Sequence, residues 1–194
     1  MADVDGVAIK TNSGPASNIT LRNNKFYGTH GMSIGSQTMD GVTNVLWDDN
    51  QMFGADQFGN VSTDNNGINI KSDYDCGGLV QQVTCRHTTL TGVKHLLVFN
   101  TIYGSCSGTP GVPCYQDIMV DGVRAVDSQS GACSEFEGYS ASNPLGPYLA
   151  NVDLGSTAQE NSQDAIVGLD NSNITPAGPG VTTFDFRPWD RRRW

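Results

Sequence analysis

The sequence predicts an all-β solenoid, in which short strands wind into stacked coils. Glycine supplies 23 of the 194 residues and only 16% of the residues are charged, whereas coiled coils and helical bundles need Ala, Glu, Lys, Leu and Arg. Short apolar alternations with the period of a half-buried strand recur along the chain. Similar phrases also recur among these strands, as expected when equivalent strands of successive coils stack side by side.

Six segments show the strand alternation, and their apolar pairs are Val7 and Ile9, Ile19 and Leu21, Met32 and Ile34, Ile68 and Ile70, Leu97 and Phe99, and Ile118 and Val120. Regular strand spacing fits a sandwich, a barrel or a solenoid. Asn and Gly, which tolerate left-handed backbone at tight corners, lie between the strands and favour the solenoid. The related phrases at 7–11, 32–36 and 68–72 favour it too, with coils of roughly 22–27 residues.

The alternation weakens beyond Val126. We expect a β-domain over residues 1–176 and a tail or cap over 177–194, with a loop at 128–147 and late strands at 149–152 and 166–169. No ten-residue stretch has convincing helical periodicity. No apolar run approaches the length of about 18 residues that a membrane span requires, so no membrane partner is expected.

The net charge of −9 argues against nucleic acid as a partner, because phosphate binding needs Lys and Arg. The five cysteines are an odd number, so at least one has no partner within the chain. A disulfide could join Cys106 to Cys114, or Cys76 to Cys85, but spacing alone does not fix the connectivity. Because no cysteine falls in a CxxC pair, we do not expect a zinc site in this chain.

Three segments place reactive side chains where stacked coils would bring them to one surface. His30 lies between glycines just before a strand, although a single histidine more often has a structural role. Asn69 and Lys71 share a face of their strand, since residues i and i+2 point the same way. Asp5 precedes another strand, and one strand per coil would bring Asp5, His30 and Lys71 together.

Four phrases, in this order, resemble glycoside hydrolase family 28, the pectin-degrading polygalacturonases. They are Asp5-Gly-Val-Ala-Ile-Lys, His30-Gly-Met-Ser-Ile-Gly-Ser, Gly67-Ile-Asn-Ile-Lys-Ser-Asp, and Tyr103 followed by Gly108-Thr-Pro-Gly-Val-Pro113. Residues 168–176 resemble a late segment of bacterial members, so the resemblance covers most of residues 5–176. It implies a right-handed parallel β-helix and inverting hydrolysis of α-1,4-galacturonan, with no metal and no cofactor.

The resemblance also implies roles for single residues. Asp5 matches a water-activating aspartate, and Lys71 would pair with a galacturonate carboxylate. His30 would hold the acid or position the substrate, and Tyr103 would hydrogen-bond the sugar. Asn69 stands where the family has an Arg that contacts the substrate.

The general acid of the family has no counterpart at its usual place, because Val4 stands there. Inverting glycosidases need two carboxyl groups about 6.5–9.5 Å apart. Asp3 and Asp5 share a strand face and lie about 6.6 Å apart along it, so Asp3 is the candidate substitute acid.

Other interpretations remain open at this point. A non-catalytic β-helix that binds acidic polysaccharide, or serves as a scaffold, would explain Val4 and Asn69. A calcium-dependent pectate lyase fits less well, because it explains neither His30 nor Tyr103.

The resemblance implies a secreted protein, although the first residues show no signal peptide. Members of the family are nearly twice as long as this chain, which implies further coils before Met1. The strand edge of the first coil would then be exposed, and it would offer a site for self-association.

Overall fold

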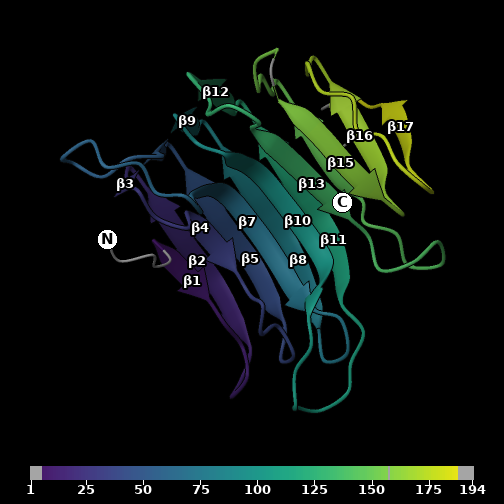
Figure 1. Ribbon diagram of the computed structural model, residues 1–194. Helices are drawn as coiled ribbons and strands as arrows, with labels where there is room; N and C mark the ends of the chain where they lie inside the picture. The colour runs from purple at the N-terminus through teal and green to yellow at the C-terminus, as the bar shows by residue number, and fades with distance from the viewer. Residues whose placement is uncertain (1–5, 157, 188–194) are drawn as a thin grey trace.

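The structure of the protein, a computed structural model, describes residues 6–156 and 158–187. In these residues the chain winds through 17 strands and forms no helix. Every pairing between named strands is parallel. Figure 1 shows the coils succeeding one another along one axis, from purple to yellow. The predicted all-β solenoid is therefore confirmed.

The strands form three sheets. The first sheet contains, in spatial order, β1 (Val7–Ile9), β4 (Met32–Ile34), β7 (Asn66–Asp73), β10 (His95–Gly104), β13 (Cys133–Glu137) and β15 (Gln159–Gln163). The second contains β17 (Thr182–Asp185), β16 (Ile166–Asp170), β14 (Pro147–Ala150), β11 (Cys114–Asp121), β8 (Leu79–Arg86), β5 (Val42–Asp48) and β2 (Ala16–Arg22). The third contains β12 (Arg124–Val126), β9 (Thr89–Thr91), β6 (Gln51–Phe53) and β3 (Lys25–Tyr27).

The related phrases of the sequence lie side by side in the first sheet. Val7 pairs with Met32, and Met32 pairs with Ile68. One position of each coil therefore meets the same position of the next, which is why similar side chains recur there.

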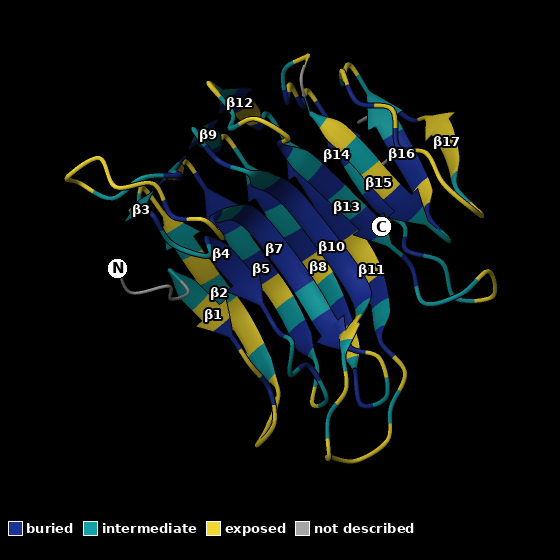
Figure 2. Ribbon diagram, viewed as in Figure 1, coloured by how far each residue is buried: buried dark blue, intermediate teal, exposed yellow. Residues whose placement is uncertain are grey.

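The inward side chains of the coils fill a continuous core. Ile34, Ile70, Phe99 and Phe136 follow one another in register across the first sheet, and all four are fully buried. Figure 2 shows this buried material along the middle of the coils, with exposed residues concentrated at the loops and at the outermost strands. Because strand residues alternate in direction, the residues between these apolar positions face outward.

Asn, Asp, His and Gly form the corner between the second and third sheets. The residue after each long strand of the second sheet has positive φ, and these residues are Asn23, Asp49, His87, Gly122, Asn151 and Asn171. Each of the first five donates its N–H to the last residue of the neighbouring strand, as Asn23 does to the Asp48 carbonyl at 3.2 Å. Asn and Asp tolerate this backbone better than most residues. The predicted role of Asn and Gly at the corners is confirmed.

The coils are less uniform than the sequence predicts. Asn44 bonds to Asn18, 26 residues earlier in the previous coil, which agrees with the expected length. Gln81 contacts Thr43, 38 residues earlier, because the loop over 54–65 lengthens this coil.

The expectation of a loop over 128–147 is wrong in part. β13 lies inside this range, and it was missed because only one large apolar residue, Phe136, marks its inward face. The late strands at 149–152 and 166–169 were placed within two residues of β14 and β16. β17 lies within 177–194 and pairs with β16.

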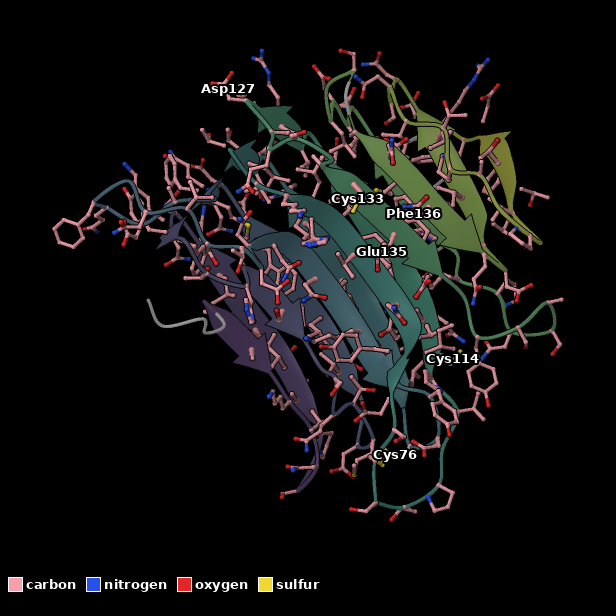
Figure 3. All side chains as sticks on the ribbon, viewed as in Figure 1. Cys76, Cys114, Asp127, Cys133, Glu135 and Phe136 are labelled. Carbon is pink, nitrogen blue, oxygen red and sulfur yellow. A yellow bond between two sulfur atoms is a disulfide. The ribbon has the colours of Figure 1, made fainter. Side chains whose placement is uncertain are left out.

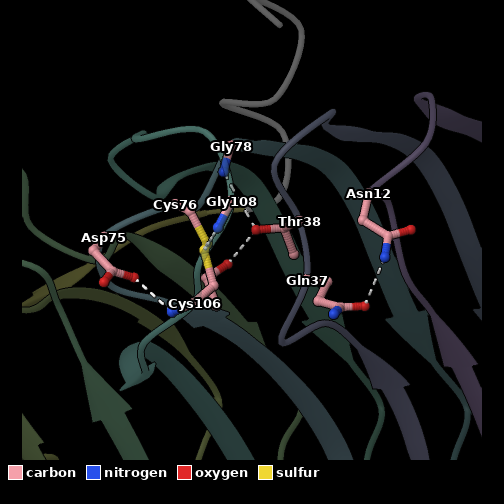
Figure 4. Close-up of a disulfide and its surroundings, with 9 residues drawn as sticks. Asn12, Gln37, Thr38, Asp75, Cys76, Gly78, Cys106 and Gly108 are labelled. Atoms are coloured by element: carbon pink, nitrogen blue, oxygen red, sulfur yellow. Dashed lines mark hydrogen bonds between the residues drawn. A yellow bond between two sulfur atoms is a disulfide. The ribbon is translucent and has the colours of Figure 1, made fainter.

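Neither of the two cysteine pairs that spacing suggested forms. The disulfide joins Cys76 to Cys106, whose Cα atoms are 6.3 Å apart, because these residues follow the neighbouring strands β7 and β10. Cys85 points into the core and Cys114 is free. Figure 4 shows the disulfide among stacked loops, where the Cys106 N–H donates to Asp75 at 3.0 Å. Sequence separation could not reveal a bridge between coils.

Among the described residues, no helix is long and apolar enough to cross a membrane.

Candidate functional site

The outward face of the first sheet carries the polar side chains that the sequence selected. On β7, Ile68 and Ile70 belong to the core, whereas Asn69 and Lys71 alternate with them. Ser33 on β4 and Val98 on β10 flank Asn69 in register. The prediction that Asn69 and Lys71 share one strand face is confirmed.

Lys71 and Tyr103 meet on this face. The Lys71 ammonium lies 4.2 Å from the centroid of the Tyr103 ring, in cation–π contact. Tyr103 lies near the end of β10 and is 55% exposed, so the pair faces solvent. A cation held over an exposed aromatic ring can receive an anionic sugar, because the ammonium donates to a carboxylate and the ring offers an apolar surface.

Asn69 is a buried polar residue with an unused acceptor. Its side chain is 3% exposed, and its Oδ1 atom has no hydrogen-bond partner among the described residues. An isolated buried acceptor costs free energy, so such groups are exceptions that need an explanation.

His30 lies in the turn before β4, between Gly28 and Gly31, both of which have positive φ. Its carbonyl oxygen accepts from the Ser33 hydroxyl at 3.5 Å. The N–H of Gly6 donates to the Gly31 carbonyl at 3.1 Å, which aligns the start of the first coil with this turn. Gly31 has no room for a side chain, because a Cβ there would meet the Asn66 and Gly67 carbonyls of the next coil.

The predicted carboxylates cannot be placed. Asp3 and Asp5, together with Val4, lie outside the described residues. Their roles as candidate substitute acid and candidate water activator therefore stay predictions.

Sequence reasoning missed two polar residues that continue the same face. Asn100 on β10 pairs in register with Lys71 and with Glu137 of β13, and its side-chain amide donates to the Glu137 carboxylate. Partial burial, with the nearby Glu135, raises the pKa of Glu137. The alternating Cys-Ser-Glu-Phe-Glu of β13 was the available signal, but it lay in the expected loop.

A surface hollow elsewhere in the molecule contains none of these residues. It is lined by Asn and Asp side chains of the late corners, including Asn151, Asp153 and Asn173. Within it, Asn173 donates to Asp153 at 2.6 Å, so its polar groups pair with one another. The outward face of the first sheet is therefore the stronger candidate site.

The comparison with known proteins decides the family. The family described as "Glycosyl hydrolases family 28" matches residues 2–172, nearly the whole chain. This chain belongs to glycosyl hydrolases family 28. A polygalacturonase of Ralstonia solanacearum is 31% identical to it, over 91% of the chain and 38% of its own length. An endo-polygalacturonase of Pectobacterium parmentieri is 36% identical, over 78% of the chain and 35% of its own length.

A solved structure supports the same assignment of this family 28 chain. The polygalacturonase from Erwinia carotovora ssp. carotovora superimposes with a TM-score of 0.67 and 32% identity, over 88% of the chain and 40% of that protein. Together with the parallel sheets, this match confirms the right-handed parallel β-helix that the resemblance implied. The chain spans 38% or less of the length of the curated relatives named above.

Proposed function

We propose that this chain carries part of the cleft of a pectin-degrading glycosidase, and that the outward face of its first sheet binds α-1,4-galacturonan. The observation that carries the proposal is the Lys71 ammonium held over the exposed Tyr103 ring, on a β-helix of family 28. The reaction we propose is hydrolysis with inversion, without a metal or cofactor. Pectic polysaccharide is then the partner, and the protein acts outside the cell.

Each candidate site residue has a proposed role in binding or hydrolysis. Lys71 pairs with a galacturonate carboxylate and Tyr103 contacts the same sugar, which the exposure of the pair allows. Asn69 offers its Oδ1, which has no partner in the described part of the chain, to a sugar hydroxyl that can donate to it. His30 positions the substrate or the acid from the neighbouring coil. Asp5 activates the attacking water, and Asp3 is the proposed substitute acid.

A second function is favoured by two substitutions. Valine at position 4 cannot donate a proton, and asparagine at 69 lacks the charge and the fork of an arginine. A β-helix that binds acidic polysaccharide without cleaving it, or that serves as a scaffold, would need neither group. Hydrolysis and non-catalytic binding share the Lys71–Tyr103 pair and differ in turnover, whereas a scaffold needs neither binding nor turnover.

Reducing-sugar release from polygalacturonate, with and without a chelator, separates these functions. Release that is insensitive to the chelator and lost in Asp5→Asn supports hydrolysis. Binding without release by the folded chain supports the non-catalytic function. Release that needs calcium and gives unsaturated products would instead indicate a lyase.

Binding to oligogalacturonate tests the site itself. Lys71→Met should weaken binding, whereas Lys25→Met, on an exposed lysine of the third sheet, should not. Equal effects of the two variants would argue against this location. Light scattering tests the proposed self-association through the first coil, and a strict monomer would count against it.

A further inference from the structure

A second group of side chains lies on the first sheet where β10 and β13 begin, away from Lys71. His95 begins β10 and Cys133 begins β13, and the two residues pair in register on neighbouring strands. Glu135 follows Cys133 by two residues, so both point outward, while Phe136 points into the core. Figure 3 shows Cys133 and Glu135 on β13.

Three different metal-binding groups converge here. One ligand atom from each of His95, Cys133 and Glu135 lies within 4.8 Å of the other two. The ring Nδ1 of His95 lies 3.5 Å from the sulfur of Cys133. With Zn–S about 2.3 Å and Zn–N about 2.0–2.1 Å, a tetrahedral zinc ion holds its sulfur and nitrogen ligands about 3.5 Å apart. The histidine and the cysteine are therefore already spaced as two ligands of one ion.

Asp64 faces the other nitrogen of the histidine ring. The other ring nitrogen of His95, Nε2, faces the Asp64 carboxylate at 4.0 Å. Metal-binding histidines commonly direct their second nitrogen to a carboxylate, which fixes the ring and raises the basicity of the coordinating nitrogen. This contact leaves Nδ1 for the side where Cys133 and Glu135 lie.

The charges also balance. A thiolate and a carboxylate together neutralise a divalent cation, and the neutral imidazole adds a third ligand without charge. Thiolate and imidazole ligands select zinc-like ions over magnesium or calcium.

We propose that Cys133, His95 and Glu135 form a site for Zn²⁺, with Asp64 positioning the histidine and the fourth position open to solvent. The Glu135 carboxylate, within 4.8 Å of the other two ligand atoms, is the third ligand of the proposed site. Among the described residues one other cluster of this kind occurs, at Asp75, Cys76 and Cys106, and it cannot serve because its sulfur atoms form the disulfide. The inference is independent of galacturonan hydrolysis.

Sequence spacing did not predict this site. The thiol and the imidazole are 38 residues apart, on neighbouring coils. The missing CxxC pair led us to expect no zinc site, but that pattern reports only on closely spaced cysteines. Because a cysteine ligand must be deprotonated, the metal must displace a proton from Cys133 and should bind more tightly as the pH rises.

The test is metal binding by the tag-free chain with its disulfide intact. Co²⁺ serves as the spectroscopic probe, and Zn²⁺ is titrated against a chromophoric chelator. We expect one ion per chain, tetrahedral d–d bands and a thiolate-to-cobalt charge-transfer band. Zn²⁺ should also protect Cys133 from a thiol reagent in a Cys114→Ser background.

Variants locate the ion. Cys133→Ser should abolish the charge-transfer band and lower Zn²⁺ affinity at least 100-fold. Glu135→Gln should keep the band with affinity about 10-fold lower, and Asp64→Asn should lower affinity about 10–100-fold. Cys114→Ser is the matched control, because Cys114 is also free and partly exposed, and it should bind normally.

Thermal unfolding shows whether each variant folds. An absent charge-transfer band in the folded wild-type chain, or an equal band in Cys133→Ser, overturns the proposal. Cys133 and His95 would then be joined only by an S–H to nitrogen hydrogen bond. If Zn²⁺ does not protect Cys133 from the thiol reagent in the Cys114→Ser chain, the proposal is overturned as well.

Discussion

Two buried asparagines occupy different parts of this β-helix and differ in their bonding. Asn50, at the corner after β5, is 0% exposed, and its Oδ1 accepts from both the backbone and the side-chain amide of Asn24 at 3.0 Å. Its Nδ2 donates to the Leu21 carbonyl at 3.1 Å. Asn69, on the outward face of the first sheet, is 3% exposed, yet its Oδ1 has no partner among the described residues.

The surroundings of the two asparagines repeat this difference. At the corner, Asp48 accepts from Arg86 at 3.0 and 3.1 Å, and it also contacts Arg22 and His87. On the outward face, Lys71 rests against the exposed ring of Tyr103. Polar groups at the corner join one coil to the next, whereas those on the outward face are available to a ligand. Burial alone does not distinguish a structural polar residue from a functional one.

The largest expected effect concerns Lys71. Lys71→Met should weaken oligogalacturonate binding about 10–100-fold, because hydrogen bonds to charged groups contribute about 1.5–3 kcal/mol. The melting temperature should stay unchanged, since the ammonium contacts an exposed ring and has no ion pair among the described residues. Calorimetric titration and thermal unfolding measure the two quantities. A large fall in melting temperature would show that Lys71 has a structural role, like the polar residues at the corner.

The two asparagines themselves give the second prediction. Asn50→Ala should lower the free energy of unfolding by about 1–3 kcal/mol, because the Asn24 backbone N–H loses its acceptor. Asn69→Ala should change stability little, since it removes an acceptor that has no partner in the described structure. Denaturant unfolding of both variants provides the measurement. Equal losses would show that Asn69 has a structural role after all.

Acid should weaken the corner in a defined pH range. Hydrogen bonds from Arg86 and His87 lower the pKa of Asp48 from 3.8 to about 2 in the folded chain. Its stabilising contribution is therefore complete above the unfolded pKa, and it is lost as the pH falls through about 2. Asp48→Asn should be less stable than the wild type at neutral pH.

This difference should shrink as the pH falls below 3.8. Urea unfolding of the two chains across the acid range measures it. A difference that stays constant down to pH about 2 would contradict the role given to the carboxylate charge.

The smallest expected effect concerns Tyr103. Tyr103→Leu should weaken oligogalacturonate binding about 2–5-fold, because an exposed cation–π contact contributes about 0.5–1 kcal/mol. Tyr103→Phe keeps the ring and should bind nearly as well as the wild type. If both substitutions reduce binding equally in the same titration, the hydroxyl group and not the ring is responsible.

Periodicity and repeated phrases were enough to predict the strands that carry the candidate site. Ile68 and Ile70 fixed the inward face of β7, so Asn69 and Lys71 were placed correctly on the other face. β13 was missed because a strand with one large inward residue resembles a polar loop. Glu137, which this strand carries, was therefore missed as well.

By itself, the sequence determined the all-β solenoid, the corners formed by Asn and Gly, and the family, because each depends on local pattern or on short phrases. Only the tertiary structure decided which residues of different coils meet. The bond between Cys76 and Cys106, the Lys71–Tyr103 contact and the meeting of His95 with Cys133 all join neighbouring coils. The physical reason is that coil length varies with the loops, so sequence distance does not fix which side chains become neighbours across a parallel sheet.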